Sequence, residues 1–134
     1  MSPQQETLVR DTISASNAGN LHFPQVVQAL LHAGVESYAV DYRAARTTVY
    51  WPDGATLSLP LSKPEQGIAD AFSSEGVRQA IAGAQRGEVM YPAFKALTQR
   101  AGCIGYTVWL SGRHVSYYGR LGESHIEPFP PQAD

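Results

Sequence analysis

The sequence predicts an α+β domain built from one unit, two helices followed by three strands, that occurs twice. When the chain is aligned with itself at an offset of 68 residues, 12 of 52 gapless pairs are identical, against roughly three expected by chance. The identities include cap and turn positions, such as Pro24 with Pro92 and Gly34 with Gly102. Such a pattern predicts an antiparallel sheet with helices on one face and a pseudo-twofold axis between the halves.

The helices of the first unit are marked by their caps. Ser2 and Pro3 form a helix start, with Gln5 placed to complete a capping box. Apolar residues at helical spacing follow, and Gly19 ends the stripe. Phe23-Pro24 begins a second helix that ends before Gly34. In the second unit we expect helices over 77–85 and from Tyr91-Pro92 to Gly102.

Three short strands follow each pair of helices. They are expected near 36–42, 46–51 and 55–60 in the first unit, and near 103–110, 113–119 and 123–128 in the second. Ser111-Gly112 predicts a two-residue hairpin turn between the first two strands of the second unit.

These patterns predict a single domain over residues 1–134, since neither half has enough apolar residues for a core of its own. Repeat 1 covers about 2–60 and repeat 2 about 74–128. A connector over about 61–73 has no counterpart in the repeat, and we expect a short helical turn in it at 68–72. The proline-rich tail, 129–134, is expected to be loosely held.

Composition excludes several classes of function. The net charge is −2, which predicts no nucleic-acid partner, and no apolar run is long enough to predict a membrane span. The polar N-terminal segment does not look like a signal peptide, and the single cysteine, Cys103, suits a reducing cytoplasm. Neither phosphate-binding nor nucleophile motifs occur, and the histidines lack metal-ligand spacing, so we expect no cofactor and no metal.

The predicted outer face of the sheet carries a candidate interface. Strand alternation places Tyr50, Trp109, His114 and Tyr118 there, away from the helices. One interpretation is that these rings only pack across small neighbours, Tyr50 over Ser37 and Tyr118 over Gly105. The other is that they form an aromatic floor for a ligand or a second subunit.

A candidate small-molecule site lies on the last predicted strand. Glu123, His125 and Glu127 alternate and therefore share one face, and their counterparts in the first unit are apolar. With Tyr117 and Arg113 from the neighbouring strand they could form a general acid–base site. His125 could also be part of a metal site. The alternative is an edge strand shifted in register, with Ile126 facing inward and the acidic residues facing water.

The chain resembles the YbcV-like proteins, an uncharacterised bacterial family often labelled "phage envelope protein". The resemblance covers about residues 20–130 and is structural in kind. It rests on Phe23-Pro24, Ala33-Gly34-Val35, Tyr38, Tyr91-Pro92-Ala93-Phe94, Ala101-Gly102, Tyr117-Tyr118 and Pro128. The family often has tryptophan where Tyr106 stands and aspartate where Gly119 stands. The resemblance implies no assigned activity and no catalytic residue, and its label implies a role in a phage particle.

Three hypotheses for function follow, and the sequence leaves all three open. The leading one is a small non-enzymatic domain that binds a partner or forms a homodimer through the outer sheet face. The second is a small-molecule enzyme or sensor with its site near Glu123, His125 and Glu127. The third, a structural component of a phage particle, rests on the family label alone.

Overall fold

The computed structural model describes residues 1–130, which form four helices and six strands in the predicted order. The element bounds are α1 Pro3–Asn17, α2 Phe23–His32, β1 Ser37–Asp41, β2 Arg46–Tyr50, β3 Thr56–Pro60, α3 Ser74–Gln85, α4 Tyr91–Arg100, β4 Cys103–Trp109, β5 His114–Gly119 and β6 Ser124–Pro128.

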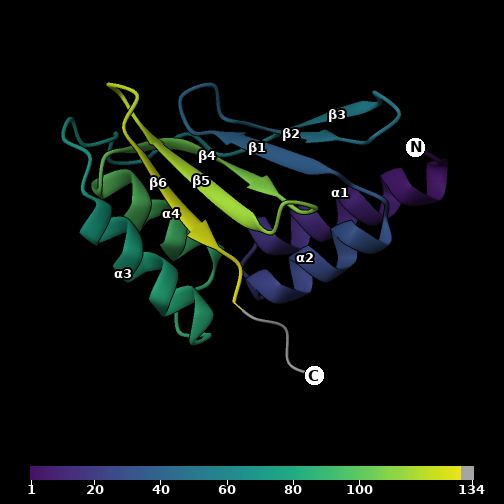
Figure 1. Ribbon diagram of the computed structural model, residues 1–134, viewed down its shortest axis with the longest axis horizontal. Helices are drawn as coiled ribbons and strands as arrows, with labels where there is room; N and C mark the ends of the chain where they lie inside the picture. Colours follow the sequence, from purple (N-terminus) through teal and green to yellow (C-terminus); the bar gives the residue numbers. More distant parts are fainter. Residues whose placement is uncertain (131–134) are drawn as a thin grey trace.

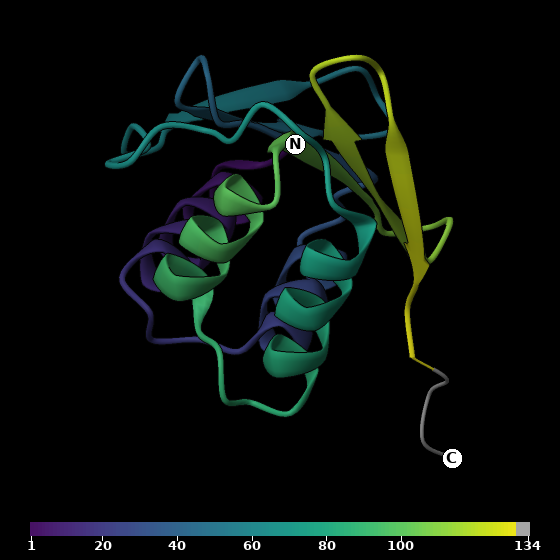
Figure 2. The ribbon, with the colours of Figure 1, turned by 90° about the vertical axis from the view of Figure 1, so that its left-hand side faces the viewer.

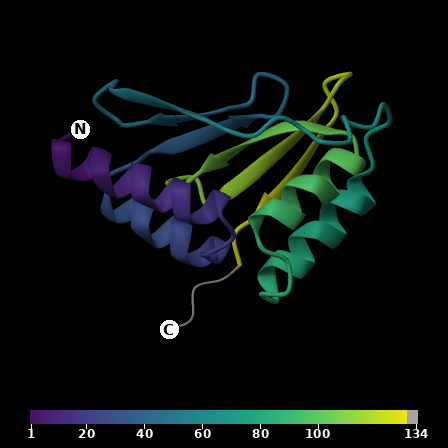
Figure 3. The same cartoon turned by 180° about the vertical axis from the view of Figure 1, so that it is seen from behind.

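The strands form one antiparallel sheet in the order β3-β2-β1-β4-β5-β6. All four helices lie on one face of this sheet, α1 and α2 as one pair and α3 and α4 as the other (Figure 1, Figure 3). The two pairs stand side by side beneath the strands (Figure 3), and Figure 2 shows them one behind the other, with α3 and α4 in front. The predicted α+β class, with helices on one face of an antiparallel sheet, is confirmed.

The two halves meet in the middle of the sheet, where β1 pairs with β4. Ala39 lies opposite Thr107, its own counterpart at the offset of 68, so a pseudo-twofold axis passes between these two residues. The pairs on either side exchange under the same offset. They are Ser37–Trp109 with Asp41–Gly105, and Tyr38–Val108 with Val40–Tyr106.

Capping explains where the helices start. The Ser2 hydroxyl accepts from the Gln5 backbone N–H at 3.1 Å, and the Gln5 side chain accepts from the Ser2 N–H at 2.8 Å. This is the capping box expected from the sequence. The Ser73 hydroxyl accepts from the Gly76 N–H in the same way, so α3 begins at Ser74, three residues before its expected start.

The predicted two-residue turn at Ser111-Gly112 is wrong, although the strand register it implied is right. Val108 does lie opposite Val115, but the last β4–β5 pair is Trp109–His114, which leaves a four-residue loop. Arg113 takes the left-handed conformation in this loop, with φ 59°. A four-residue loop keeps the same pairs opposite each other, because it removes one residue from each strand.

The connector after β3 contains no helical turn, contrary to the expectation for 68–72. It runs past the end of α4, where Ala69 N–H donates to Gln99 O at 3.0 Å and Ser73 N–H donates to Ala101 O at 2.7 Å. These hydrogen bonds satisfy the last carbonyls of α4. The connector is therefore fixed by backbone bonds rather than by a helix of its own.

One buried side chain joins the halves beneath the sheet. Tyr42, in the loop after β1, is fully buried, and its hydroxyl lies 2.8 Å from the Thr98 hydroxyl on α4. Its ring packs edge-on against Tyr106 of β4, with centroids 6.0 Å apart. A first-half residue thus completes the second-half core, which favours one cooperative unit.

Candidate functional site

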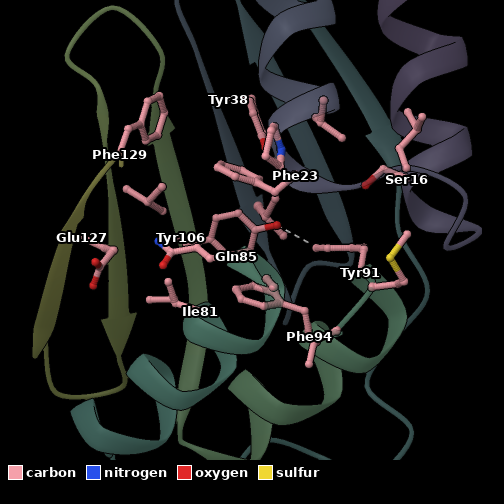
Figure 4. Close-up of a pocket in the computed structure, with 18 of the residues that line it drawn as sticks. Ser16, Phe23, Tyr38, Ile81, Gln85, Tyr91, Phe94, Tyr106, Glu127 and Phe129 are labelled. Carbon is pink, nitrogen blue, oxygen red and sulfur yellow. Dashed lines mark hydrogen bonds between the residues drawn. The ribbon is translucent and has the colours of Figure 1, made fainter. Parts of the chain in front are cut away.

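A cavity of about 110 Å³ lies under the centre of the sheet, between the two helix pairs (Figure 4). The C-terminal ends of α1 and α3 and the first turns of α2 and α4 surround it, and β1, β4 and β5 roof it. Helix packing leaves this space because each helix pair packs mainly within itself, with few contacts across to the other pair.

The cavity wall follows the pseudo-twofold axis. Eight pairs of lining residues are counterparts at the offset of 68, so both halves contribute the same positions. They are Ile13/Ile81, Ser16/Ala84, Asn17/Gln85, Leu21/Val89, Phe23/Tyr91, Val26/Phe94, Tyr38/Tyr106 and Thr47/Val115. The symmetry is broken on one side, where Tyr117 and Glu127 line the cavity and their counterparts, Val49 and Leu59, do not.

Four tyrosines bring hydroxyl groups to this mostly apolar wall. The Tyr106 hydroxyl donates to the Tyr91 hydroxyl oxygen at 3.0 Å (Figure 4). The hydroxyls of Tyr38 and Tyr117 make no hydrogen bond with a described residue, although both side chains are buried. Neither is sealed off, because Gln99 Nε2 is the only fully enclosed polar side-chain atom without a partner in residues 1–130. These two hydroxyls therefore open onto the cavity.

The cavity tyrosines are neutral hydrogen-bonding groups at physiological pH. Burial raises the pKa of Tyr38 and Tyr91 far above the usual value, and nearby Tyr91 adds to the effect at Tyr38. Burial likewise raises the pKa of Tyr106 and Tyr117. A neutral phenol both donates and accepts, so these groups can bind either kind of polar ligand atom.

The structure brings three of the predicted site residues together at the edge of this cavity. His125 lies opposite Tyr117, their rings 6.4 Å apart, and His125 Nε2 lies 3.0 Å from Glu127 Oε1. Both side chains face the helices, whereas Ile126 is 59% exposed on the other face. The alternative of a shifted edge strand with Ile126 inward is therefore wrong.

The other two predicted site residues lie apart from this pair. The Glu123 carboxylate accepts from the Leu121 N–H at 2.9 Å and so belongs to the β5–β6 turn. The Arg113 guanidinium lies over the Phe129 ring, 5.5 Å from its centroid. Neither Glu123 nor Arg113 lines the cavity.

Phe129 was expected in a loosely held tail, but it is firmly packed. Its N–H donates to Arg113 O at 2.9 Å, and its ring meets that of Phe23 edge-on at 6.0 Å. It thereby closes one side of the cavity (Figure 4). Residues 131–134 of the predicted tail lie outside the described residues.

The residues of the candidate interface lie on the outer sheet face, with the predicted register. Tyr50 is opposite Ser37 and Tyr118 is opposite Gly105. Tyr50 and Trp109 are each 39% exposed, and they flank a shallow depression whose floor includes Ser37 and Ala39.

Hydrogen bonds hold two of these outer rings within the sheet. Trp109 Nε1 donates to the Ser116 hydroxyl at 3.2 Å, and the Tyr118 hydroxyl donates to that of Thr107 at 3.3 Å. The His114 ring lies beside that of Trp109, with centroids 6.3 Å apart. Cross-strand packing thus accounts for Tyr118, whereas Tyr50 and Trp109 keep exposed ring surface.

Sequence reasoning did not reveal that Tyr38 and Tyr106 line a cavity. It also missed Phe23 and Tyr91, at the starts of α2 and α4. The sequence does contain a pattern that could have indicated the cavity wall, because aromatic residues occupy counterpart positions at Phe23/Tyr91 and Tyr38/Tyr106. Counterpart residues near a pseudo-twofold axis necessarily approach each other.

Other reactive groups offer little chemistry. Burial raises the pKa of the Cys103 thiol to about 11, and the thiol donates to Gly105 O at 3.1 Å. A buried thiol of that kind is a poor nucleophile. Among residues 1–130, no cluster of His, Cys, Asp or Glu could hold a metal ion, and no helix is long and apolar enough to cross a membrane.

Comparison with known proteins gives a family but no activity. A search of curated proteins finds no match. A family model matches residues 11–126, and this range runs from the second half of α1 into β6. The chain therefore belongs to the family described as "Protein of unknown function (DUF1398)".

Proposed function

We propose that this domain is a non-enzymatic binding module that takes a small, ring-sized molecule between its two helix pairs. The observation that carries the proposal is the pair of hydroxyls, on the buried side chains Tyr38 and Tyr117, that open onto the cavity without a protein partner among the described residues. Each of these hydroxyls can donate to or accept from a polar ligand atom. A ligand with one polar atom would hydrogen-bond to one of these hydroxyls, while its apolar part fills the rest of the cavity.

Size limits the ligand. A cavity of about 150 Å³ lined by apolar side chains binds benzene, whereas drug-sized ligands occupy roughly 300–1,000 Å³. The 110 Å³ here therefore suits a single ring. The cavity is only partly enclosed, and Glu127 in its wall is 29% exposed, so a short polar substituent can extend beyond the enclosed volume there.

Binding is favoured over catalysis because neither the cavity tyrosines nor the Cys103 thiol is an activated group. The tyrosines are held neutral by burial, so none is available as a base near neutral pH. Cys103 is buried and hydrogen-bonded to a carbonyl. The His125–Glu127 pair remains, and the enzyme or sensor hypothesis now depends on it alone.

A cavity-filling variant tests the binding proposal. We expect benzyl alcohol to shift the backbone amide resonances of β1, β4 and the first turns of α2 and α4. Ala84→Leu should abolish these shifts, because Ala84 lines the cavity. The matched control is Ala82→Leu on the same helix, whose side chain is outside the lining. Shifts that survive Ala84→Leu, or no shifts in the parent protein, would contradict the proposal.

A second candidate function is self-association through the outer sheet face. It is supported by Tyr50 and Trp109, two exposed rings beside a floor of small residues. A second copy related by a twofold axis would bury all four rings, and aromatic residues are favoured at interface centres.

The double variant Tyr50→Ala with Trp109→Ala tests self-association. We expect it to stay folded, because both rings are partly exposed, and to lower the dimer fraction at least tenfold in sedimentation equilibrium, as is typical when interface hot spots are lost. Leu121→Ala is the control, since Leu121 is 88% exposed at the β5–β6 turn. A monomeric parent protein rules this function out.

We further propose that the chain falls among the YbcV-like members of its family and works in the cytoplasm, with the free thiol of Cys103 as support. A phage-particle role is supported only by the label of that group. It requires higher-order assembly, so the same sedimentation experiment tests it.

A further inference from the structure

We propose that the ligand of the cavity is a monocation, a ring-sized amine whose ammonium group pairs with Glu127. This inference rests on the binding function proposed above and adds the chemical class of the ligand. It follows from the presence of one carboxylate in the cavity wall and from the lack of a basic side chain among the described lining residues.

The cavity wall carries one formal charge. Glu127 is the only acidic residue among the described lining residues, and no lysine, arginine or histidine accompanies it. An anionic ligand would therefore meet a carboxylate and no compensating cation. A cationic ligand would meet a carboxylate, which attracts positive charge, and several aromatic rings, whose faces also attract it.

Glu127 is placed to receive such a group. It reaches the cavity from β6, on the side opposite Tyr91 (Figure 4). Its Oε1 is held by His125 Nε2 at 3.0 Å, which fixes the carboxylate and leaves Oε2 without a described partner. The side chain is 29% exposed, so it is screened less than a fully exposed surface carboxylate.

The helix ends around the cavity do not change this balance. Each helix end carries about half an elementary charge, positive at the start and negative at the end. The ends of α1 and α3 and the starts of α2 and α4 surround the cavity, so two partial charges of each sign oppose one another. Glu127 thus sets the sign of the site.

The arginine close to this edge is engaged elsewhere. Arg113 lies over the Phe129 ring, and its Nη2 donates to Pro130 O at 3.4 Å. It lies outside the cavity lining, and its distance from Glu127 exceeds that of an ion pair. The Glu127 carboxylate is therefore available to a ligand cation.

Three probes of nearly equal size test the class of ligand: benzylammonium, benzyl alcohol and benzoate. In amide-resonance titrations we expect benzylammonium to bind roughly tenfold more tightly than benzyl alcohol, the effect of one charge-assisted hydrogen bond. Benzoate should bind most weakly. Glu127→Gln should remove the advantage of the cation and leave benzyl alcohol unchanged. Glu123→Gln, the same change at a carboxylate outside the cavity, should keep the advantage.

The outcomes separate the two proposals. If none of the three probes shifts the cavity resonances, both the binding function and the ligand class are overturned. If benzyl alcohol or benzoate binds as tightly as benzylammonium, only the ligand class is overturned. A preference for the cation that persists in Glu127→Gln also overturns it, because the charge recognition then lies elsewhere.

Discussion

Replacing Gly102 by alanine is expected to destabilise the protein by about 3 kcal/mol or more. Gly102 has φ +82°, a conformation that costs an L-residue about 1–2 kcal/mol. A Cβ there would lie 2.1 Å from Ala71 O and 2.8 Å from Phe72 Cα, which is backbone and has no rotamer to adopt. The connector would have to move, and the bond from Ser73 N–H to Ala101 O would weaken.

The chain contains matched controls for this prediction. Gly34, the counterpart of Gly102, has φ +79°, but a Cβ there meets side chains rather than backbone: the end of Gln5 at 3.1 Å and the Trp51 ring at 3.8 Å. Gly54 has φ +90° and nothing within 4 Å. Both alanine variants should lose about 1 kcal/mol of stability, which is the cost of positive φ for a residue with a Cβ. Urea unfolding of the three variants measures the difference, and equal losses would show that the connector does not press on Gly102.

The same contrast shows what the sequence could and could not predict. It identified Gly34 and Gly102 as equivalent helix ends, which holds, because both take positive φ. The sequence did not indicate that the connector would pack against Gly102, whereas among residues 1–130 no such segment packs against Gly34. That segment has neither helical nor strand periodicity, and its path is set by hydrogen bonds to the carbonyls of Gln99 and Ala101.

The strands were predictable because alternation fixes both face and register. Tyr117, His125 and Glu127 were expected on one face, and the structure places them together. The turn at Ser111-Gly112 was mispredicted because the left-handed residue is Arg113, an unusual choice for that conformation.

The cavity could not be predicted from local patterns. Phe23 and Tyr38 belong to one half, and Tyr117 and Glu127 to the other. They meet only because the helix pairs stand apart beneath the central strands, which is a property of tertiary packing. The alternation along β6 therefore predicted the charged residues at the cavity edge but not the aromatic residues of the cavity wall.

The second large effect is expected at high pH, where the protein should unfold cooperatively. Burial raises the pKa of five tyrosines above the usual 10.0, and it is the largest cause for each of them. They are Tyr38, Tyr42, Tyr91, Tyr106 and Tyr117. A raised pKa means that the folded state holds these protons more tightly than the unfolded state. The stabilisation is thus complete below pH 10 and is lost as the pH rises above it.

The size of this effect follows from the number of groups. Each tyrosine that ionises only on unfolding contributes about 1.4 kcal/mol per pH unit, so five contribute up to about 7 kcal/mol per unit. Since domains are typically stable by about 5–15 kcal/mol, we expect unfolding at about pH 11–12. Circular dichroism and tyrosinate absorbance, followed together, should change in one transition.

The double variant Tyr38→Phe with Tyr117→Phe isolates the cause of alkaline unfolding. These hydroxyls make no hydrogen bond with a described residue, so their removal should cost little stability near neutral pH. This variant lacks two of the five ionising tyrosines. The midpoint of alkaline unfolding should therefore move to higher pH, and the free energy of unfolding should fall less steeply with pH. Tyrosinate absorbance that rises while circular dichroism stays constant would mean that the buried rings ionise in the folded protein. In that case water and hydroxide enter the cavity freely, and its tyrosine hydroxyls are already hydrogen-bonded to water.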